Sequence, residues 1–148
     1  MRRATPCIGI CSTTYGDLVC RGCKRFAHEI VEWNAFTAEQ RDRVWERLQR
    51  LRDACTAEWL RVVDERALDA RIAELRVPTW ASASPLGRAY ELMWRERATW
   101  SALDAAGIAP TDVVGAQAVV DVRRAIDDEF LRRSKAEYEH SFRIPADA

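Results

Sequence analysis

Four of the five cysteines lie close together near the start of the chain. They are Cys7, Cys11, Cys20 and Cys23, in the pattern C-x3-C-x8-C-x2-C. Two closely spaced pairs separated by a longer stretch are typical of structural zinc sites, in which four thiolates fill every coordination position and none is left open for catalysis. We therefore predict that these four cysteines are the ligands of one metal site.

Disulfide formation is the alternative chemistry for clustered thiols. The chain starts with Met1-Arg2-Arg3 and reaches Pro6 and Cys7 without the apolar stretch of a signal peptide. We expect a cytoplasmic protein, because reducing compartments keep thiols reduced and available for a metal.

The identity of the metal depends on spacing and charge. Four thiolates around Zn²⁺ give a formally dianionic site, and nearby cations would offset that charge: Arg2, Arg3, Arg21, Lys24 and Arg25. The same cations would suit an iron–sulfur cluster, but the familiar cluster spacings C-x2-C-x2-C and C-x4-C-x2-C are absent. The spacing favours zinc and leaves an iron–sulfur cluster as the alternative.

Short local elements must position the thiols. Gly22 allows a tight turn between Cys20 and Cys23. Residues 13–19 predict a hairpin that turns at Gly16-Asp17, and a helical pattern over residues 24–33 follows the last cysteine directly.

The cysteines and the residues after them form a recognisable set of motifs. These are T-P-C-I-G-I-C at residues 5–11, V-C-R-G-C-K-R at residues 19–25, and the later Glu29-Ile30, Glu32-Trp33, Val44-Trp45 and Leu48. Over about residues 5–50 the chain resembles a small bacterial family, the domain of unknown function 1289, whose members are often labelled predicted iron–sulfur proteins. The resemblance implies that Cys7, Cys11, Cys20 and Cys23 act together as ligands. It implies no reaction.

The remainder of the chain has helical periodicity. Thr37 to Gln40 predicts a capping box, and an apolar stripe follows it at steps of three and four: Val44, Leu48, Leu51, Cys55, Trp59 and Val62. We expect either a break around residues 64–69 or a helix that bridges two lobes. Ser84-Pro85 predicts the start of a third helix that Gly107 ends, and Thr111-Asp112 predicts a fourth. No strand is expected after residue 20.

The predicted fold is mainly α. A small four-cysteine metal-binding module with a short β-hairpin occupies residues 1–53, and an α-helical bundle or hairpin, with a hinge near residues 77–85, occupies residues 54–148.

Other chemistry-bearing residues have simpler interpretations. His28 follows the cysteines, but four thiols already close a zinc site, so we expect it to pack or lie on the surface. His140 belongs to a single Glu-x-x-His step, whereas a di-iron bundle uses two. Cys55 lies on the apolar stripe and is expected in the core. Trp80, Trp94 and Trp100 are interpreted as core, as a partner-binding surface or as the lining of an apolar pocket.

Charge and composition narrow the function. Lys+Arg and Asp+Glu both number 23, which excludes a polybasic chain, and no stretch is apolar enough to cross a membrane. A weak nucleic-acid option remains on one helix, through Arg41, Arg43, Arg47, Arg50 and Arg52. No nucleophile–base pair or phosphate loop occurs, so we do not expect an enzyme.

The sequence favours a cytoplasmic accessory protein with a structural metal and a protein partner. An iron–sulfur redox carrier or sensor that serves an oxidoreductase is the first alternative, and a nucleic-acid-binding regulator is the second.

Overall fold

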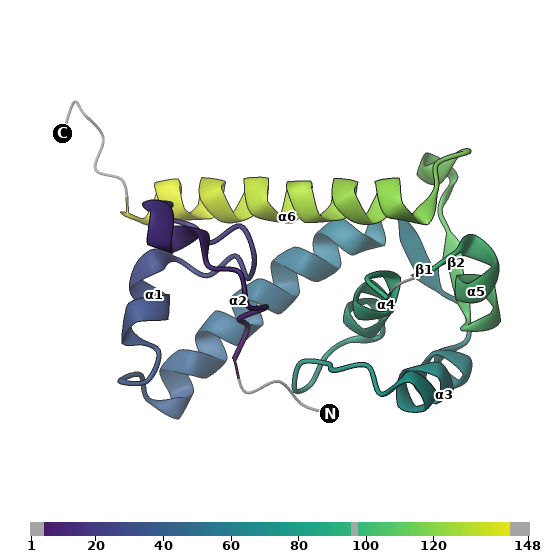
Figure 1. Ribbon diagram of the computed structural model, residues 1–148, viewed down its shortest axis with the longest axis horizontal. Coiled ribbons are helices and arrows are strands. Elements are labelled where there is room, and N and C mark those ends of the chain that lie inside the picture. Colours follow the sequence, from purple (N-terminus) through teal and green to yellow (C-terminus); the bar gives the residue numbers. More distant parts are fainter. Residues whose placement is uncertain (1–4, 96–97, 143–148) are drawn as a thin grey trace. The chain divides into compact units, whose positions relative to one another are not determined.

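The chain is mainly α-helical. A computed structural model describes residues 5–95 and 98–142, and these contain six α-helices, two 3-10 helices and one small antiparallel sheet (Figure 1). The helices are α1 (Ala27–Glu32), α2 (Ala38–Ala57), α3 (Glu65–Leu75), α4 (Pro85–Met93), α5 (Trp100–Ala105) and α6 (Val119–Phe142). The strands are β1 (Leu60–Val62) and β2 (Ile108–Pro110), and the 3-10 helices are η1 (Ser12–Tyr15) and η2 (Asp112–Val114).

Contacts divide the described residues into two compact units. The cysteine unit contains residues 5–51 and 129–142, and the sheet unit contains residues 52–95 and 98–128. Both α2 and α6 therefore contribute residues to each unit. The expected boundary near residue 53 concerns parts that fold independently, and it stays a prediction.

The cysteine unit is built from η1, α1, the first part of α2 and the last part of α6. The predicted capping box is confirmed, because Thr37 Oγ1 accepts the Gln40 N–H at 3.2 Å and Gln40 Oε1 accepts the Thr37 N–H at 2.8 Å. The buried apolar side chains of this unit come from α2, α6, the cysteine turn and the two residues that flank α1: Val19, Phe26, Trp33, Val44, Leu48, Leu51 and Phe130.

The sheet unit is organised around β1 and β2, which pair in antiparallel register with Leu60 opposite Pro110 and Val62 opposite Ile108. Each helix that starts in this unit before β2 has a side-chain cap. Asp64, Ser84 and Thr99 accept backbone N–H groups in the first turns of α3, α4 and α5. The core comprises Leu68, Leu92, Met93, Leu103, Ile108, Val122 and Ile126.

The hairpin predicted over residues 13–19 is wrong. Residues 12–15 form η1, and Gly16, with a φ of +98°, ends this helix by donating its N–H to the Thr13 carbonyl. A positive φ at Gly16 closes a helical turn instead of a strand reversal, because Thr14 and Tyr15 before it are already helical.

The expectation of no strand after residue 20 is also wrong, since β1 and β2 lie at residues 60–62 and 108–110. Three-residue strands are too short to show the period-two alternation that identifies a strand in sequence. Of the two alternatives for the long helical pattern, the structure has a break, but at residues 58–64 and not at residues 64–69: α2 ends at Ala57, and Asp64 caps α3.

Other helix boundaries differ from expectation. The third helix is divided into α4 and α5, and the fourth begins with η2 before α6. The helix after the cysteines starts at Ala27, because Lys24 has a φ of +66° and cannot continue a helix.

Candidate metal centre

Cys20 and Cys23 lie at the tip of a short hairpin-like turn. The backbone on either side is joined by a bridge between Val19 and Phe26, and the Ala27 N–H donates to the Leu18 carbonyl at 2.8 Å. Closer to the tip, the Cys20 N–H donates to the Arg25 carbonyl at 2.9 Å and the Lys24 N–H donates to the Cys20 carbonyl at 2.8 Å. Both cysteines are buried, with 1% and 4% of their surface exposed. The chain reversal therefore holds this pair in a fixed position.

Cys7 and Cys11 lie in a more open loop. Cys7 is exposed and Cys11 is half-buried. Gly9, with a φ of +91°, allows the loop to turn, and its N–H donates to Cys7 Sγ at 3.4 Å. Cys11 Sγ hydrogen-bonds Thr13 Oγ1 at 2.8 Å.

The two cysteine loops pack against each other. Cys20 Sγ donates to the Ile10 carbonyl at 3.5 Å, and the Arg21 N–H donates to Ser12 Oγ at 2.8 Å. Gly22 is the point of closest approach, because a Cβ at this position would lie 2.6 Å from the Ile10 carbonyl oxygen. Ile10, which lies between Cys7 and Cys11, is thus in contact with Gly22, which lies between Cys20 and Cys23.

The buried thiols have different electrostatic environments. Burial opposes ionisation of Cys20, but backbone N–H groups of Cys23, Ser12 and Gly22 outweigh it, so the pKa of the Cys20 thiol is lowered. Burial raises the pKa of the Cys23 thiol, although Arg25 partly offsets this by donating its Nε–H to Cys23 Sγ at 3.3 Å.

Each of the four sulfurs lies beside a polar group of the residue two positions later. The Gly9 N–H donates to Cys7 Sγ, and the backbone groups of Gly22 and Arg25 act to lower the pKa of the Cys20 and Cys23 thiols. The Thr13 hydroxyl is the partner of Cys11. N–H donors directed at sulfur stabilise the thiolate form, which is the form that binds metals. Of the four, Cys20 is the cysteine whose surroundings lower its pKa and so favour the thiolate.

The four sulfurs do not form one coordination shell in the structure. Across residues 5–95 and 98–142, no group of three or more His, Cys, Asp or Glu side chains is arranged to hold a metal ion. What supports metal binding is the presence of four thiol donors and the hydrogen bonds that join their two loops.

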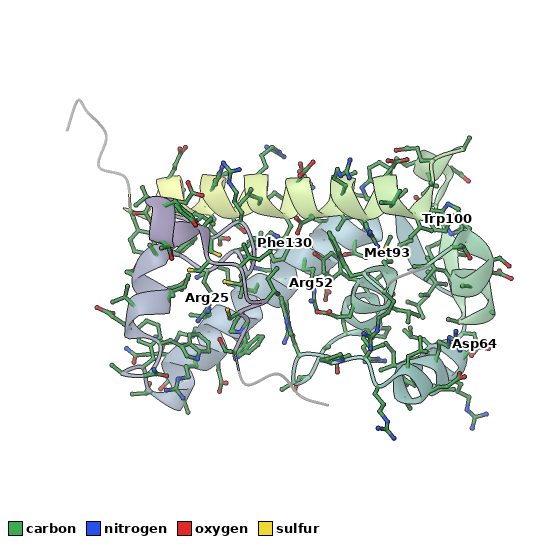
Figure 2. The ribbon with its side chains drawn as sticks, viewed as in Figure 1. Arg25, Arg52, Asp64, Met93, Trp100 and Phe130 are labelled. Carbon is green, nitrogen blue, oxygen red and sulfur yellow. The ribbon has the colours of Figure 1, made fainter. Side chains whose placement is uncertain are left out.

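Buried cations surround the second cysteine pair. Lys24 and Arg25 are 2% and 4% exposed, and Figure 2 labels Arg25 together with Phe130 of α6. Lys24 Nζ donates to the Gly22 carbonyl at 3.1 Å and lies 5.3 Å from the Phe130 ring centroid, and the Arg25 guanidinium lies 4.9 Å from the Trp33 ring centroid. Arg21 is exposed and pairs with Asp17, and Arg2 and Arg3 lie outside the described residues.

A buried ion pair supports the helix after the cysteines, and sequence reasoning missed it. Arg47 donates from both terminal nitrogens to the two Glu29 oxygens at 2.6 Å each, and Glu29 also accepts the Phe26 N–H at 2.8 Å. One sequence signal could have identified Glu29. It lies three residues after Phe26, the residue before α1, and a glutamate at this position often accepts the backbone N–H of the residue before the helix.

The five arginines considered for nucleic acid do not form one exposed cationic face. Arg41 donates to the Trp33 and Asn34 carbonyls, Arg43 pairs with exposed Glu39, and Arg47 pairs with Glu29. In the same unit, Arg50 pairs with Glu137 at 2.7 Å. Arg52, in the sheet unit, is 1% exposed.

The three tryptophans expected to cluster have three different environments in the sheet unit. Trp80 is buried, and the Arg52 guanidinium carbon lies 3.5 Å from its ring centroid. Arg52 also forms an ion pair with Glu91, with 3.0 Å between nitrogen and oxygen. Trp94 is 42% exposed, whereas Trp100 Nε1 donates to the Gln117 carbonyl at 2.7 Å. Figure 2 labels Arg52 and Trp100. Trp80 is thus a core residue and Trp94 a surface residue.

The remaining candidates have structural surroundings. Cys55 is fully buried in α2, as expected. His28 is exposed, and its ring lies 5.1 Å from Phe142. His140 is exposed near the end of α6.

These observations define a mainly α chain with a compact cysteine-rich segment at its start. Residues 5–52 match the model of a family described as protein of unknown function (DUF1289). This match confirms the resemblance drawn from the cysteine motifs, and it extends from the first cysteine loop to Arg52 in α2. Neither the curated proteins nor the solved structures contain a significant match to the chain. Among the described residues, no helix is both long enough and apolar enough to cross a membrane.

Proposed function

We propose that this chain is a non-enzymatic accessory protein that uses Cys7, Cys11, Cys20 and Cys23 to hold one structural metal ion, with zinc as the favoured metal. The observation that carries the proposal is that the four sulfurs lie on two loops that pack against each other, each sulfur beside a polar group of the residue two positions later. Four unrelated cysteines would have no reason to share this arrangement.

A four-thiolate zinc ion would act as a cross-link. It would join the exposed loop of Cys7 and Cys11 to the buried turn of Cys20 and Cys23, and it would leave no open position for a substrate. Lys24 and Arg25 would offset part of its negative charge. The proposal requires a reducing compartment such as the cytoplasm, because the thiols must stay reduced.

The cysteine loops also carry the apolar residues that support a partner-binding role. Four large side chains in this short stretch are exposed: Ile8 (52%), Ile10 (67%), Tyr15 (90%) and Leu18 (58%). Exposed apolar residues concentrated on one short segment indicate a protein interaction site. A metal that fixes the loops would hold these side chains in a defined arrangement for a protein partner.

Elemental analysis tests the proposal directly. The full chain is purified without oxygen or added metal, its metal content is measured, and a visible spectrum is recorded. About one zinc per chain with no visible absorption is the expected result. Iron with matching sulfide and a brown solution would replace zinc with an iron–sulfur cluster on the same cysteines. A chain that takes up neither metal, even when zinc is supplied, would contradict the proposal.

A further inference from the structure

We infer that the two cysteine pairs have unequal roles: Cys20 and Cys23 form the fixed half of the metal site, and Cys7 and Cys11 form the half through which the metal enters and leaves. The inference rests on the proposed function and concerns how the same site is loaded and emptied.

The first support is the difference in backbone restraint. Four backbone contacts hold the turn around Cys20 and Cys23 in one conformation: the Val19–Phe26 bridge and three hydrogen bonds. Over residues 7–10, by contrast, every hydrogen bond found in the described part of the chain involves a side chain. The Cys7 N–H donates to Thr5 Oγ1, the Gly9 N–H donates to Cys7 Sγ, and the Ile10 carbonyl accepts from Cys20 Sγ. A segment with few backbone hydrogen bonds opens at low free-energy cost.

The second support is the difference in access. Cys7 is exposed and Cys11 half-buried, whereas Cys20 and Cys23 are 1% and 4% exposed. A metal ion, a chelator or an electrophile therefore reaches the first pair before the second. The buried pair lies next to Lys24 and Arg25, whose positive charges repel an approaching cation from that side.

The two loops touch in a way that permits closure. Contacts between them go through Ile10, Ser12 and Gly22, and Gly9 allows the first loop to turn. The Cys7–Cys11 loop can close without any change in the Val19–Phe26 bridge and the backbone hydrogen bonds that hold Cys20 and Cys23. The metal would reach the exposed pair first, and closure of the loop would then bring it to the fixed pair.

Alkylation kinetics on the full chain test the inference. In each modification the thiolate sulfur forms a bond to the methylene carbon of iodoacetamide, iodide leaves, and the thiol proton passes to the buffer. The protein is stripped with a chelator, exposed to a limiting amount of iodoacetamide, and mapped by mass spectrometry at successive times. We expect Cys7 and Cys11 to react at least about tenfold faster than Cys20 and Cys23, because access limits the buried thiols.

The chain supplies its own control, because Cys55 is fully buried in the sheet unit and stays unmodified as long as that unit is folded.

Adding zinc before alkylation separates the possible failures. Protection of all four cysteines by about one equivalent of zinc, together with the expected order in the stripped protein, supports both proposals. Protection by zinc without the expected order overturns this inference and leaves the proposed function intact. No protection at any of the four positions overturns both.

Metal release from variants gives an independent measurement. We expect Cys7→Ser to keep one zinc but to release it to a chromophoric chelator about tenfold faster than the unmodified protein. Cys23→Ser should lose stoichiometric zinc binding, because the fixed half is broken. Equal release from the two variants, or stoichiometric binding kept only by Cys23→Ser, would contradict the assignment.

Discussion

Glu29 and Arg47 show how single residues support the cysteine unit. The carboxylate receives two short hydrogen bonds from Arg47 and one from the Phe26 backbone. The guanidinium also lies over the Phe26 ring, 3.9 Å from its centroid. The side chains are 6% and 15% exposed. Because both charges are largely removed from water, neither is tolerated without the other.

Arg47→Ala should therefore be strongly destabilising. Removing the guanidinium leaves the Glu29 carboxylate buried with only the Phe26 N–H, and we expect the free energy of unfolding to fall by about 3 kcal/mol. Urea unfolding followed by tryptophan fluorescence measures the change. Arg43→Ala is the matched control, since Arg43 pairs with Glu39 while both side chains are more than 70% exposed, and it should cost less than about 0.5 kcal/mol. Equal losses in the two variants would contradict the role given to the buried pair.

At this scale, spacing identifies residues whose partners are close in sequence. The four cysteines stand out because C-x3-C and C-x2-C are local patterns, and Thr37 and Gln40 because a capping box spans four residues. Arg47 instead appears in sequence as one more charge on a solvated helix. Its partner is 18 residues away, and only the folded structure brings them together.

Among the elements, the contact between the cysteine loops depends on the absence of a side chain at Gly22. A Cβ at this position would lie 2.6 Å from the Ile10 carbonyl oxygen and 3.0 Å from Ile8 Cγ1. The nearer atom belongs to the backbone and cannot be relieved by a change of rotamer. The first loop would have to move away from the second.

Gly22→Ala should accordingly weaken metal binding. We expect about a tenfold loss of zinc affinity, because displacement of the first loop misplaces Cys7 and Cys11 relative to the other pair. Competition with a chromophoric chelator measures the affinity. Gly16→Ala is the control, because a Cβ there meets nothing within 4 Å. That variant carries a strained backbone at a φ of +98° and should cost about 1 kcal/mol of stability while leaving zinc affinity unchanged. An unchanged affinity in Gly22→Ala would contradict the close contact.

Helix α6 contains a cluster that should respond to acid. Hydrogen bonds from Arg132 and Arg133 lower the pKa of Glu129 to about 2. A carboxylate with a lowered pKa stabilises the fold above its ordinary pKa, and this contribution is lost as the pH falls towards 2. Because the cluster is near the surface, its contribution is at most about 1 kcal/mol.

Glu129→Gln should reduce stability by that amount at pH 7 and by progressively less between about pH 5 and pH 2, where the unmodified protein loses the same contribution. Urea unfolding over this pH range checks the convergence. A double variant with Arg132→Gln and Arg133→Gln should behave in the same way. A constant difference at every pH would contradict the assignment to Glu129.

Elements with local signals were predicted, and elements that depend on distant partners were not. The starts of α2 and α4 follow from their caps, because capping residues act within one turn. The pairing of β1 with β2 joins segments more than 40 residues apart, and each strand has only three residues.

For the molecule as a whole, the sequence does not indicate how the two compact units share the chain. Residues 129–142 belong with the cysteines, although 71 residues (58–128) separate them from the end of α2. The Phe26 ring lies 5.1 Å from Tyr138 and 5.6 Å from Phe142, Lys24 lies over Phe130, and Arg50 pairs with Glu137. Hydrophobic periodicity places Phe130 and Tyr138 on a buried face of a helix, but it contains no information about which segment covers that face.

This arrangement changes what the loss of the metal should do. The binding energy of a structural zinc site is about 10–16 kcal/mol, as large as the whole stability of an ordinary domain. Under the proposed function, the cysteine unit would depend on the metal for its folding. Phe26, which packs on α6, directly follows the cysteine turn. We expect the double variant Cys20→Ser/Cys23→Ser to lose order both in residues 5–51 and in residues 129–142, while the sheet unit stays folded on its own core.

Hydrogen exchange measured by mass spectrometry resolves these segments. Amide protection should fall by at least about a hundredfold over residues 5–51 and 129–142, and it should be kept over the core of residues 52–95 and 98–128. Treating the unmodified chain with a zinc chelator should reproduce the same pattern, which separates loss of the metal from an effect of the serines. Protection that survives around Phe26 and Tyr138 in the variant would show that apolar packing alone holds the cysteine unit together. Uniform loss over the whole chain would instead show that the two units, joined through α2 and α6, unfold as one.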